Sequence, residues 1–224
     1  MSDAKERAAS AAKPSSPEGE RARALKTGRR RVELKLIRDR AHYADVVMGA
    51  VANARVSVWI ATANVKELRI EAPVGSRARA SGRYISILEL MSDLAARGVE
   101  LRLLHAGVPS RAFQAELRRT PRLRDGGLEM RCCPRVHLKM IAVDGGALYL
   151  GSANFTGAGL GAKGEGRRNF EAGILTDDDV LLDEMQGVFD AIWSGRECGP
   201  CALRSVCPAP LDRPPPKRRA PRSG

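Results

Sequence analysis

Apolar residues recur along the chain in short runs, and the spacing within each run separates expected strands from expected helices. Dense runs of β-branched and aliphatic residues predict strands at 32–37, 55–63, 99–107, 128–133 and 170–175. Apolar residues three and four positions apart predict amphipathic helices at 43–54, 85–98, 111–120 and 177–193. The strand–helix–strand order indicates an α/β fold whose sheet is covered by helices. The polar, basic stretch 66–84 is expected to be a loop.

Residues 136–154, VHLKMIAVDGGALYLGSAN, predict a hairpin in which two apolar strands flank a glycine-containing turn. If Gly145-Gly146 form a two-residue loop, Asp144 faces Ala147. If Asp144-Gly145 form it, Val143 faces Gly146. These alternatives differ by an even shift of register, so the same side chains share a face in both.

Four polar residues interrupt this apolar hairpin and are expected to lie together on one face. In the first register His137 faces Asn154 and Lys139 faces Ser152, and in the second His137 faces Ser152. The ammonium, hydroxyl and carboxamide can hold phosphate oxygens, while the imidazole can attack phosphorus or move a proton. Taken singly, the same residues would fit an exposed sheet face near a turn. Taken together, they indicate a site for phosphoryl chemistry.

The spacing of these residues resembles a known signature. The hairpin reads His137-x-Lys139-x4-Asp144-x6-Gly151-Ser152-x-Asn154. This is similar to the complete HxKx4Dx6GSxN motif of the phospholipase D superfamily, present here once per chain. The layout of residues 32–193 also resembles one phospholipase D-like domain, which implies a mixed β-sheet flanked by helices on both faces.

The resemblance implies a role for each motif residue. His137 would be the nucleophile that forms a phosphohistidine, Lys139 and Asn154 would bind the phosphate, and Ser152 would support it. Asp144, at a strand end, is better described as structural than as a direct participant.

A carboxylate further along the chain also resembles part of the family's site. In Asn169-Phe170-Glu171, Glu171 resembles the family carboxylate that orients the motif histidine, and it could fix the tautomer of His137. The candidate catalytic residues are therefore His137, Lys139, Asp144, Asn154 and Glu171, and the candidate phosphate ligands are Lys139, Ser152 and Asn154.

One motif supplies only half of such a mechanism, which needs a second histidine to protonate the leaving group. The other histidines, His42 and His105, lack the H-x-K pattern and are interpreted as structural. We therefore expect a homodimer in which two copies of His137 face each other across a two-fold axis. The chemistry requires no metal.

The cysteines form a separate pattern near the C-terminus. Cys198-x2-Cys201-x5-Cys207 has the look of a ligand loop that lacks its fourth member, which Cys133 or its neighbour Cys132 could supply. The spacing also resembles the C-terminal cysteines of iron–sulfur nucleases related to the RecB family. A structural zinc ion, a [4Fe–4S] cluster and free thiols all remain open. Disulfides are not expected, because the number of cysteines is odd and no export signal is visible.

Charge is concentrated at the chain ends. Of the formal +12, residues 1–31 carry +5 and residues 209–224 carry +4, which leaves +3 for the region between. Both tails are expected to be disordered, flanking a phospholipase D-like domain at 32–197 and a Cys-rich module at 198–208. No signal peptide or membrane span is visible, so a cytoplasmic protein is expected.

These observations favour a metal-independent phosphodiesterase, with a nuclease acting on DNA or RNA as the leading hypothesis, since basic tails would add sequence-independent affinity for nucleic acid. The alternative is a phospholipase D or a cardiolipin synthase-like phosphatidyl transferase, for which the tails would contact an anionic leaflet. A non-catalytic nucleic-acid-binding protein is the third interpretation.

Overall fold

The fold is built on one mixed β-sheet. The computed structural model describes residues 31–72 and 75–213, and the fold lies within residues 33–213. The expected tails therefore fall largely outside the described residues. The sheet order is β1 (Lys35–Arg38), β9 (Ala172–Thr176), β8 (Ala147–Gly151), β7 (Met140–Val143), β2 (Ser57–Thr62), β5 (Glu100–His105) and β6 (Glu129–Cys132). Neighbours from β1 to β2 are antiparallel, whereas β2, β5 and β6 run parallel.

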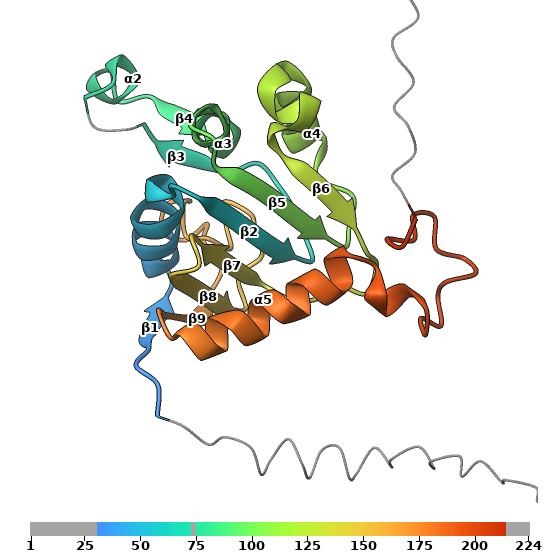
Figure 1. Cartoon of the computed structure of the whole chain (residues 1–224). Coiled ribbons are helices and arrows are strands. Elements are labelled where there is room, and N and C mark those ends of the chain that lie inside the picture. The colour runs from blue at the N-terminus through green and yellow to red at the C-terminus, as the bar shows by residue number, and fades with distance from the viewer. Residues whose placement is uncertain (1–30, 73–74, 214–224) are drawn as a thin grey trace, which may run out of the picture. The chain divides into compact units, whose positions relative to one another are not determined.

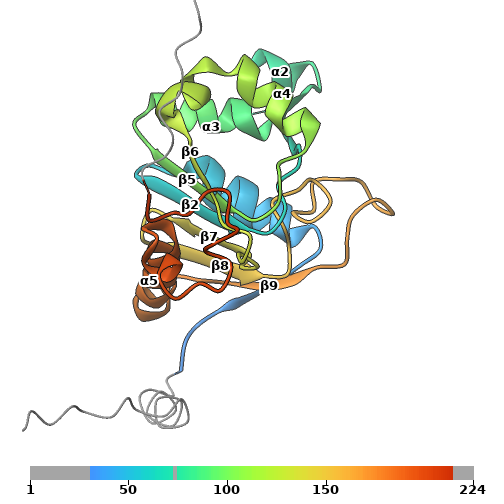
Figure 2. The ribbon, with the colours of Figure 1, turned by 90° about the vertical axis from the view of Figure 1, so that its right-hand side faces the viewer.

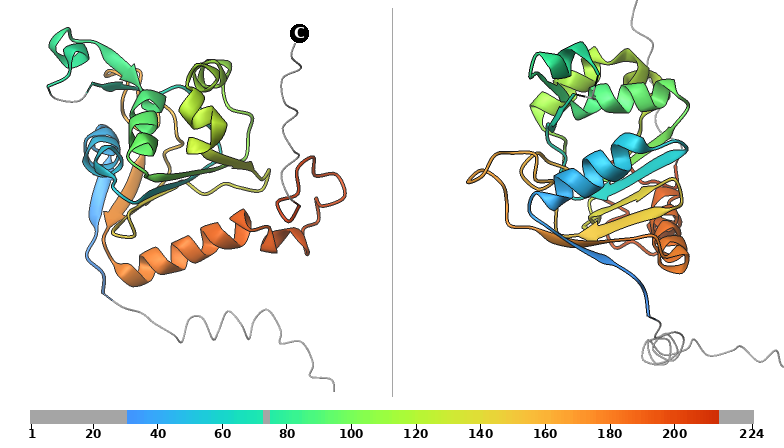
Figure 3. Two further views of the ribbon diagram at one scale, coloured as in Figure 1. Left: turned by 45° about the horizontal axis from the view of Figure 1, so that its top comes forward. Right: turned by 90° about the vertical axis from the view of Figure 1, so that its left-hand side faces the viewer.

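Helices cover both faces of the sheet, as predicted. On one face lie the π-helix η1 (His42–Ala50), the short η2 (Val51–Asn53), α3 (Ile87–Ala96), α4 (Arg111–Arg119) and η3 (Leu123–Gly127). On the other lies α5 (Asp179–Trp193), whose Leu182 and Phe189 are buried against the sheet. Figures 1 and 3 show α5 on the side of the sheet opposite to α3 and α4. Within the described residues, no helix is both long and apolar enough to cross a membrane.

The stretch 66–84 differs from the expected loop. It contains β3 (Arg69–Glu71), α2 (Arg77–Ala80) and the start of β4 (Tyr84–Ser86), and β3 and β4 form a separate two-stranded sheet. Leu68, Ile70 and Ala72 are all at most 1% exposed. Their alternation with charged residues is the period-two pattern of a half-buried strand, which the high charge of the segment concealed.

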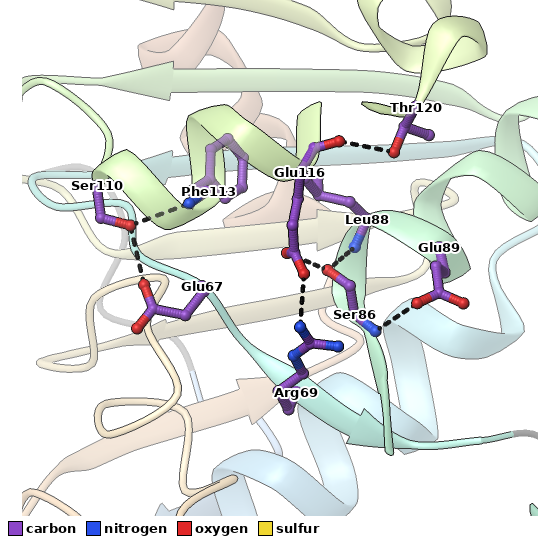
Figure 4. Close-up of polar contacts among 9 residues, drawn as sticks. All are labelled: Glu67, Arg69, Ser86, Leu88, Glu89, Ser110, Phe113, Glu116 and Thr120. Carbon is purple, nitrogen blue, oxygen red and sulfur yellow. Dashed lines mark hydrogen bonds and ion pairs between the residues drawn. The ribbon is translucent and has the colours of Figure 1, made fainter. Parts of the chain in front are cut away.

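Polar contacts attach this small sheet to α4 (Figure 4). The Ser86 hydroxyl donates to a Glu116 carboxylate oxygen at 2.6 Å, and Arg69 forms an ion pair with the same carboxylate at 2.9 Å. Ser86 also accepts from the backbone of Leu88 while Glu89 accepts from the backbone of Ser86, a capping box that begins α3. These contacts hold β3 and β4, which follow β2 along the chain, against α3 and α4.

The central hairpin of β7 and β8 has a register that differs from both predictions. Val143 pairs with Ala147 across a three-residue loop, with Asp144 at φ +55° and Gly145 at φ +63°. The Gly146 N–H donates to the Val143 carbonyl at 3.0 Å. Both central turn residues are thus left-handed, as in a type I′ turn followed by one bulged residue. The extra residue moves the strand pairing by one position relative to each predicted register, which is an odd shift.

This odd register breaks the predicted alignment of side chains across the hairpin. Gly151, rather than Ser152, pairs with Lys139, since the Gly151 N–H donates to the Lys139 carbonyl at 3.1 Å. Strand alternation therefore does not place Ser152 and Asn154 on the hairpin face of His137 and Lys139. The expectation of one shared hairpin face is wrong, and another feature must gather these residues.

Candidate active site

Strand order gathers the candidate residues at one end of the sheet. Because β7 and β9 are both antiparallel to β8, the chain entering β7 and β9 lies beside the chain leaving β8. His137 and Lys139 precede β7, Ser152 and Asn154 follow β8, and Glu171 precedes β9. The end of β2 joins them since β2 is antiparallel to β7.

His137 and Lys139 form one pair. The Lys139 ammonium nitrogen lies 3.0 Å from each ring nitrogen of His137, and it donates to the His137 backbone carbonyl at 3.0 Å. His137 is exposed and Lys139 is half-buried. An exposed imidazole beside a fixed cation can attack an electrophile whose negative oxygens the cation holds.

Ser152 and Glu171 form a second group. The Ser152 hydroxyl donates to one oxygen of Glu171, and it accepts the Ala172 backbone N–H at 3.1 Å. Asn169 donates to the other oxygen of Glu171 at 3.0 Å. The Glu171 carboxylate therefore bonds to Ser152 and Asn169 here, and its orientation of His137 stays a prediction.

Asn154 is oriented by residues that sequence analysis missed. Its side-chain oxygen accepts from the Thr62 hydroxyl at 3.2 Å and from the Asn64 backbone N–H at 3.1 Å. With its oxygen engaged, the Asn154 amide NH2 is the end left to donate to a ligand. In the sequence, the feature that could have identified them is the occurrence of two polar residues, Thr62 and Asn64, at the end of a buried strand. Within the described residues, no hydrogen bond links His137 or Lys139 to Ser152, Asn154 or Glu171.

Asp144 lies at the opposite end of the sheet and caps the start of β2. Its carboxylate accepts the backbone N–H groups of Arg55, Val56 and Ser57, the last two at 2.8 Å. Burial acts to raise the pKa of the Asp144 carboxyl, but these three bonds outweigh it, so the pKa lies below its usual value. Asp144, counted above among the candidate catalytic residues, therefore lies apart from the other motif side chains and holds the start of β2.

The remaining histidines are buried in structural positions. His42 is 0% exposed and packs edge-on against the Tyr149 ring, with centroids 5.4 Å apart. His105 is 7% exposed and its Nδ1 lies 2.9 Å from the Gly107 carbonyl oxygen. Burial lowers the pKa of both histidines, which favours neutral rings.

A polar pocket of about 200 Å³ adjoins the site. Asn154 and Asn169 contribute to its lining, together with the exposed Lys66 and Lys163. Glu67 also lines the pocket, so its lining holds two cations and one carboxylate beside a motif amide, a net positive charge that favours an anion.

The five cysteines are free thiols that line another pocket, at the end of β6. A hydrogen bond from Arg135 lowers the pKa of the Cys201 thiol, whereas burial raises the pKa of the Cys132 thiol. Among the described residues, no three His, Cys, Asp or Glu side chains stand in a metal-coordinating arrangement.

A family profile described as "Cardiolipin synthase, PLD-like domain" matches residues 47–193. The chain belongs to the phospholipase D-like family. The matched range of the phospholipase D-like domain begins in η1 and ends with α5, so it contains every motif residue. A search of curated proteins gave no match.

Three solved structures align with about seven tenths of this chain. NucT from Helicobacter pylori is 15% identical with a TM-score of 0.50, covering 71% of this chain and 94% of that one. Nuc from Salmonella typhimurium, a phospholipase D family member, is 17% identical with a TM-score of 0.46, covering 73% and 95%. Phosphatidylserine synthase from Haemophilus influenzae is 14% identical with a TM-score of 0.49, covering 71% and 36%. At 15% identity, the likeness to NucT shows a shared fold.

Proposed function

We propose that the protein is a metal-independent phosphodiesterase that hydrolyses nucleic acid through a phosphohistidine, in an active site completed by a second copy of the chain. The observation that carries the proposal is that four residues of the complete motif, His137, Lys139, Ser152 and Asn154, lie at one end of the sheet. There His137 is exposed to solvent with the Lys139 ammonium against its ring.

The chain's own groups support a two-step displacement. In the first step a ring nitrogen of His137 attacks phosphorus, the bond to the leaving oxygen breaks, and that oxygen takes a proton from a second imidazolium. In the second step water attacks phosphorus, the second imidazole takes the water proton, and the P–N bond breaks. Lys139 and the Asn154 amide would stabilise the charge on the non-bridging oxygens throughout.

The charge around the site favours a polyanionic substrate. Lys66 and Lys163 line the pocket beside Asn154, where a neighbouring phosphate of a nucleic-acid strand could bind. The basic segments at both chain ends would add affinity that falls with salt.

A second subunit is required because only one histidine of this chain carries the motif. His42 and His105 are buried, so neither is free to protonate a leaving group at the surface. Phe170, between Asn169 and Glu171, is 99% exposed. A fully exposed phenylalanine beside an incomplete site supports coverage of this surface by a partner, and a second copy would complete the chemistry.

Lipid chemistry is the second candidate, because the matching family profile is described by a cardiolipin synthase. A phospholipase or phosphatidyl transferase would use the same His137 nucleophile on a phospholipid phosphate. The difference lies in the substrate that the neighbouring surface binds.

The test is a substrate panel in EDTA. Plasmid, single-stranded DNA, RNA and anionic phospholipid vesicles are each incubated with the wild-type protein, with H137N and with K35Q. Lys35 lies on β1, away from the motif, and forms an ion pair with Asp45. K35Q therefore controls for the loss of a surface cation. We expect cleavage of nucleic acid by wild type and K35Q, and a loss of about 10³-fold or more in H137N. Turnover of lipid alone would favour the second candidate, and turnover of no substrate would contradict both and favour a binding protein.

Mixed subunits test the shared site. Wild-type and H137N chains are co-expressed at varied ratios with different affinity tags, and the activity of the total pool is measured. If each site needs two His137 side chains, activity falls with the square of the wild-type fraction. A linear fall would contradict the shared site while leaving the nucleophile intact.

A further inference from the structure

The end of the sheet that carries His137 also carries the cysteine pocket. Cys132 is the last residue of β6 and Cys133 follows it, while Cys198 ends the short η4 (Arg196–Cys198) after α5. Cys201 and Cys207 lie in the segment beyond. All five line one pocket of about 310 Å³. Figures 1 and 2 show that this C-terminal segment returns from α5 to the end of the sheet.

The C-terminal segment has little regular secondary structure and little buried apolar surface to hold it in place. Residues 199–213 form no helix or strand and are built from successive turns, such as Cys201 N–H to the Cys198 carbonyl at 3.2 Å. Val206 is 75% exposed, and Leu211 is the segment's buried apolar residue. The Arg131 guanidinium, on β6, donates to the Leu211 carbonyl at 2.6 Å. A turn-rich segment with so little core is the type that a metal stabilises in small modules.

The thiols share one pocket, and one of them already accepts a backbone hydrogen bond. The Leu211 backbone N–H donates to the Cys198 sulfur at 3.3 Å, an interaction of the kind that supports ligating thiolates. Arg135 lines the pocket and would offset part of the charge of the thiolates, whereas Arg204, also in the lining, is ion-paired with Asp212. Apolar side chains, among them Val136 and Ile192, make up much of the remaining wall.

Cys132 differs from the other four cysteines. Its thiol donates to the Ala106 carbonyl at 3.3 Å, so it already has a partner as a protonated S–H group. Cys133, the next residue, makes no such bond through its sulfur within the described residues.

We propose that Cys133, Cys198, Cys201 and Cys207 ligate a metal centre that joins the C-terminal segment to the end of β6. A single zinc ion requires four sulfurs at about 2.3 Å from one point, whereas in an iron–sulfur cluster each thiolate binds a separate iron. The pocket of about 310 Å³ that the five cysteines line has room for such a cluster, so a cluster is the centre that we expect.

The centre would position the segment that carries the nucleophile. Cys133 precedes His137 by four residues, and its carbonyl accepts the Val136 N–H at 2.9 Å. Its own N–H donates to the His105 carbonyl at 2.9 Å. A bond from metal to Cys133 would therefore constrain the backbone on which His137 lies.

The experiment measures metal directly, without substrate, so its result is independent of the proposed phosphodiesterase activity. The full chain is purified without oxygen from iron-supplemented cells, and iron, acid-labile sulfide and zinc are quantified together with the visible absorption spectrum. Variants C133S, C198S and C207S are compared with C132S, which keeps a hydroxyl donor for the Ala106 carbonyl.

We expect wild type and C132S to contain about one centre per chain and the other three variants to lose most of it. Iron with sulfide would identify a cluster. Zinc alone would support the metal centre and overturn the preference for a cluster. Wild-type protein that is folded and free of iron and zinc would overturn the proposal, and loss of metal in C132S but not in C133S would overturn the ligand assignment.

Discussion

The Asp144 side-chain oxygen Oδ1 lies 2.8 Å from the backbone nitrogen of Ser57, where β2 begins. The same carboxylate binds two further backbone N–H groups, so the turn of one hairpin holds the start of the central strand. We expect Asp144→Ala to lower the free energy of unfolding by about 2 kcal/mol, because these charge-assisted bonds are lost. Urea denaturation measures the change.

A matched variant separates stability from catalysis. Asp144→Asn keeps the Oδ1 acceptor and should lose less stability than the alanine variant. Both should retain kcat within a few-fold below their melting temperatures, since Asp144 lies at the end of the sheet away from His137. A large drop in kcat for a folded variant would assign Asp144 a part in the reaction.

The Thr62 hydroxyl orients the Asn154 carboxamide and offers a test of a positioning residue. Thr62→Val keeps the shape and removes one of two donors, so the Asn154 carboxamide is held by the Asn64 N–H alone and is oriented less firmly. We expect kcat to fall about ten- to a hundred-fold with KM less affected. Thr176→Val is the control, because Thr176 is also buried and bonded to a backbone carbonyl, that of Glu33, at the other end of the sheet. Equal losses in both variants would indicate a general effect on folding.

Phe170 tests the surface on which a second copy would lie. Burial of a phenylalanine side chain contributes about 1.5–3 kcal/mol, so Phe170→Ala should weaken self-association by about ten-fold or more. Val56→Ala, at a 65% exposed position beside the Asp144 turn, should leave it unchanged. Sedimentation equilibrium measures both. If Phe170→Ala lowers activity while the association constant is unchanged, Phe170 contacts substrate instead.

Buried histidines predict a loss of stability in mild acid. Burial lowers the pKa of His42 and His105 below the ordinary value of 6.5, so the unfolded chain takes up protons first as the pH falls. The stability that the neutral rings contribute is complete above pH 6.5 and is lost progressively below it. His105→Asn should have a flatter melting-temperature profile than wild type between about pH 8 and pH 5.5. Parallel profiles would contradict the assignment for His105.

The sequence predicted the layers of the fold better than the geometry of the candidate site. Apolar spacing located the main strands and helices, because burial on one or two faces determines that spacing. It missed β3 and β4, where buried Leu68 and Ile70 stand among arginines and glutamates. The number of apolar residues there is small, so charge dominated the interpretation.

The β7–β8 hairpin shows why the strand register could not be predicted from the sequence. Both predicted registers assumed a two-residue loop, but the loop has three residues: Asp144 and Gly145 are left-handed, and Gly146 is the additional residue. That conformation is stabilised by contacts with residues nearly ninety positions away, at Arg55 to Ser57. Local sequence does not contain them. The contacts of Thr62 with Asn154 are equally long-range, which is why Thr62 was missed.

The strand order also places the proposed functional groups and the Asp144 cap at opposite ends of the sheet. The end of the sheet with His137, Asn154 and the cysteines carries the groups proposed for chemistry and metal binding, while the Asp144 end carries a cap. Gly145 and Gly146 are exposed at that second end. A fluorescent label or surface tether attached beside them would therefore leave the opposite end open, so that single molecules could be followed while they act on a long substrate.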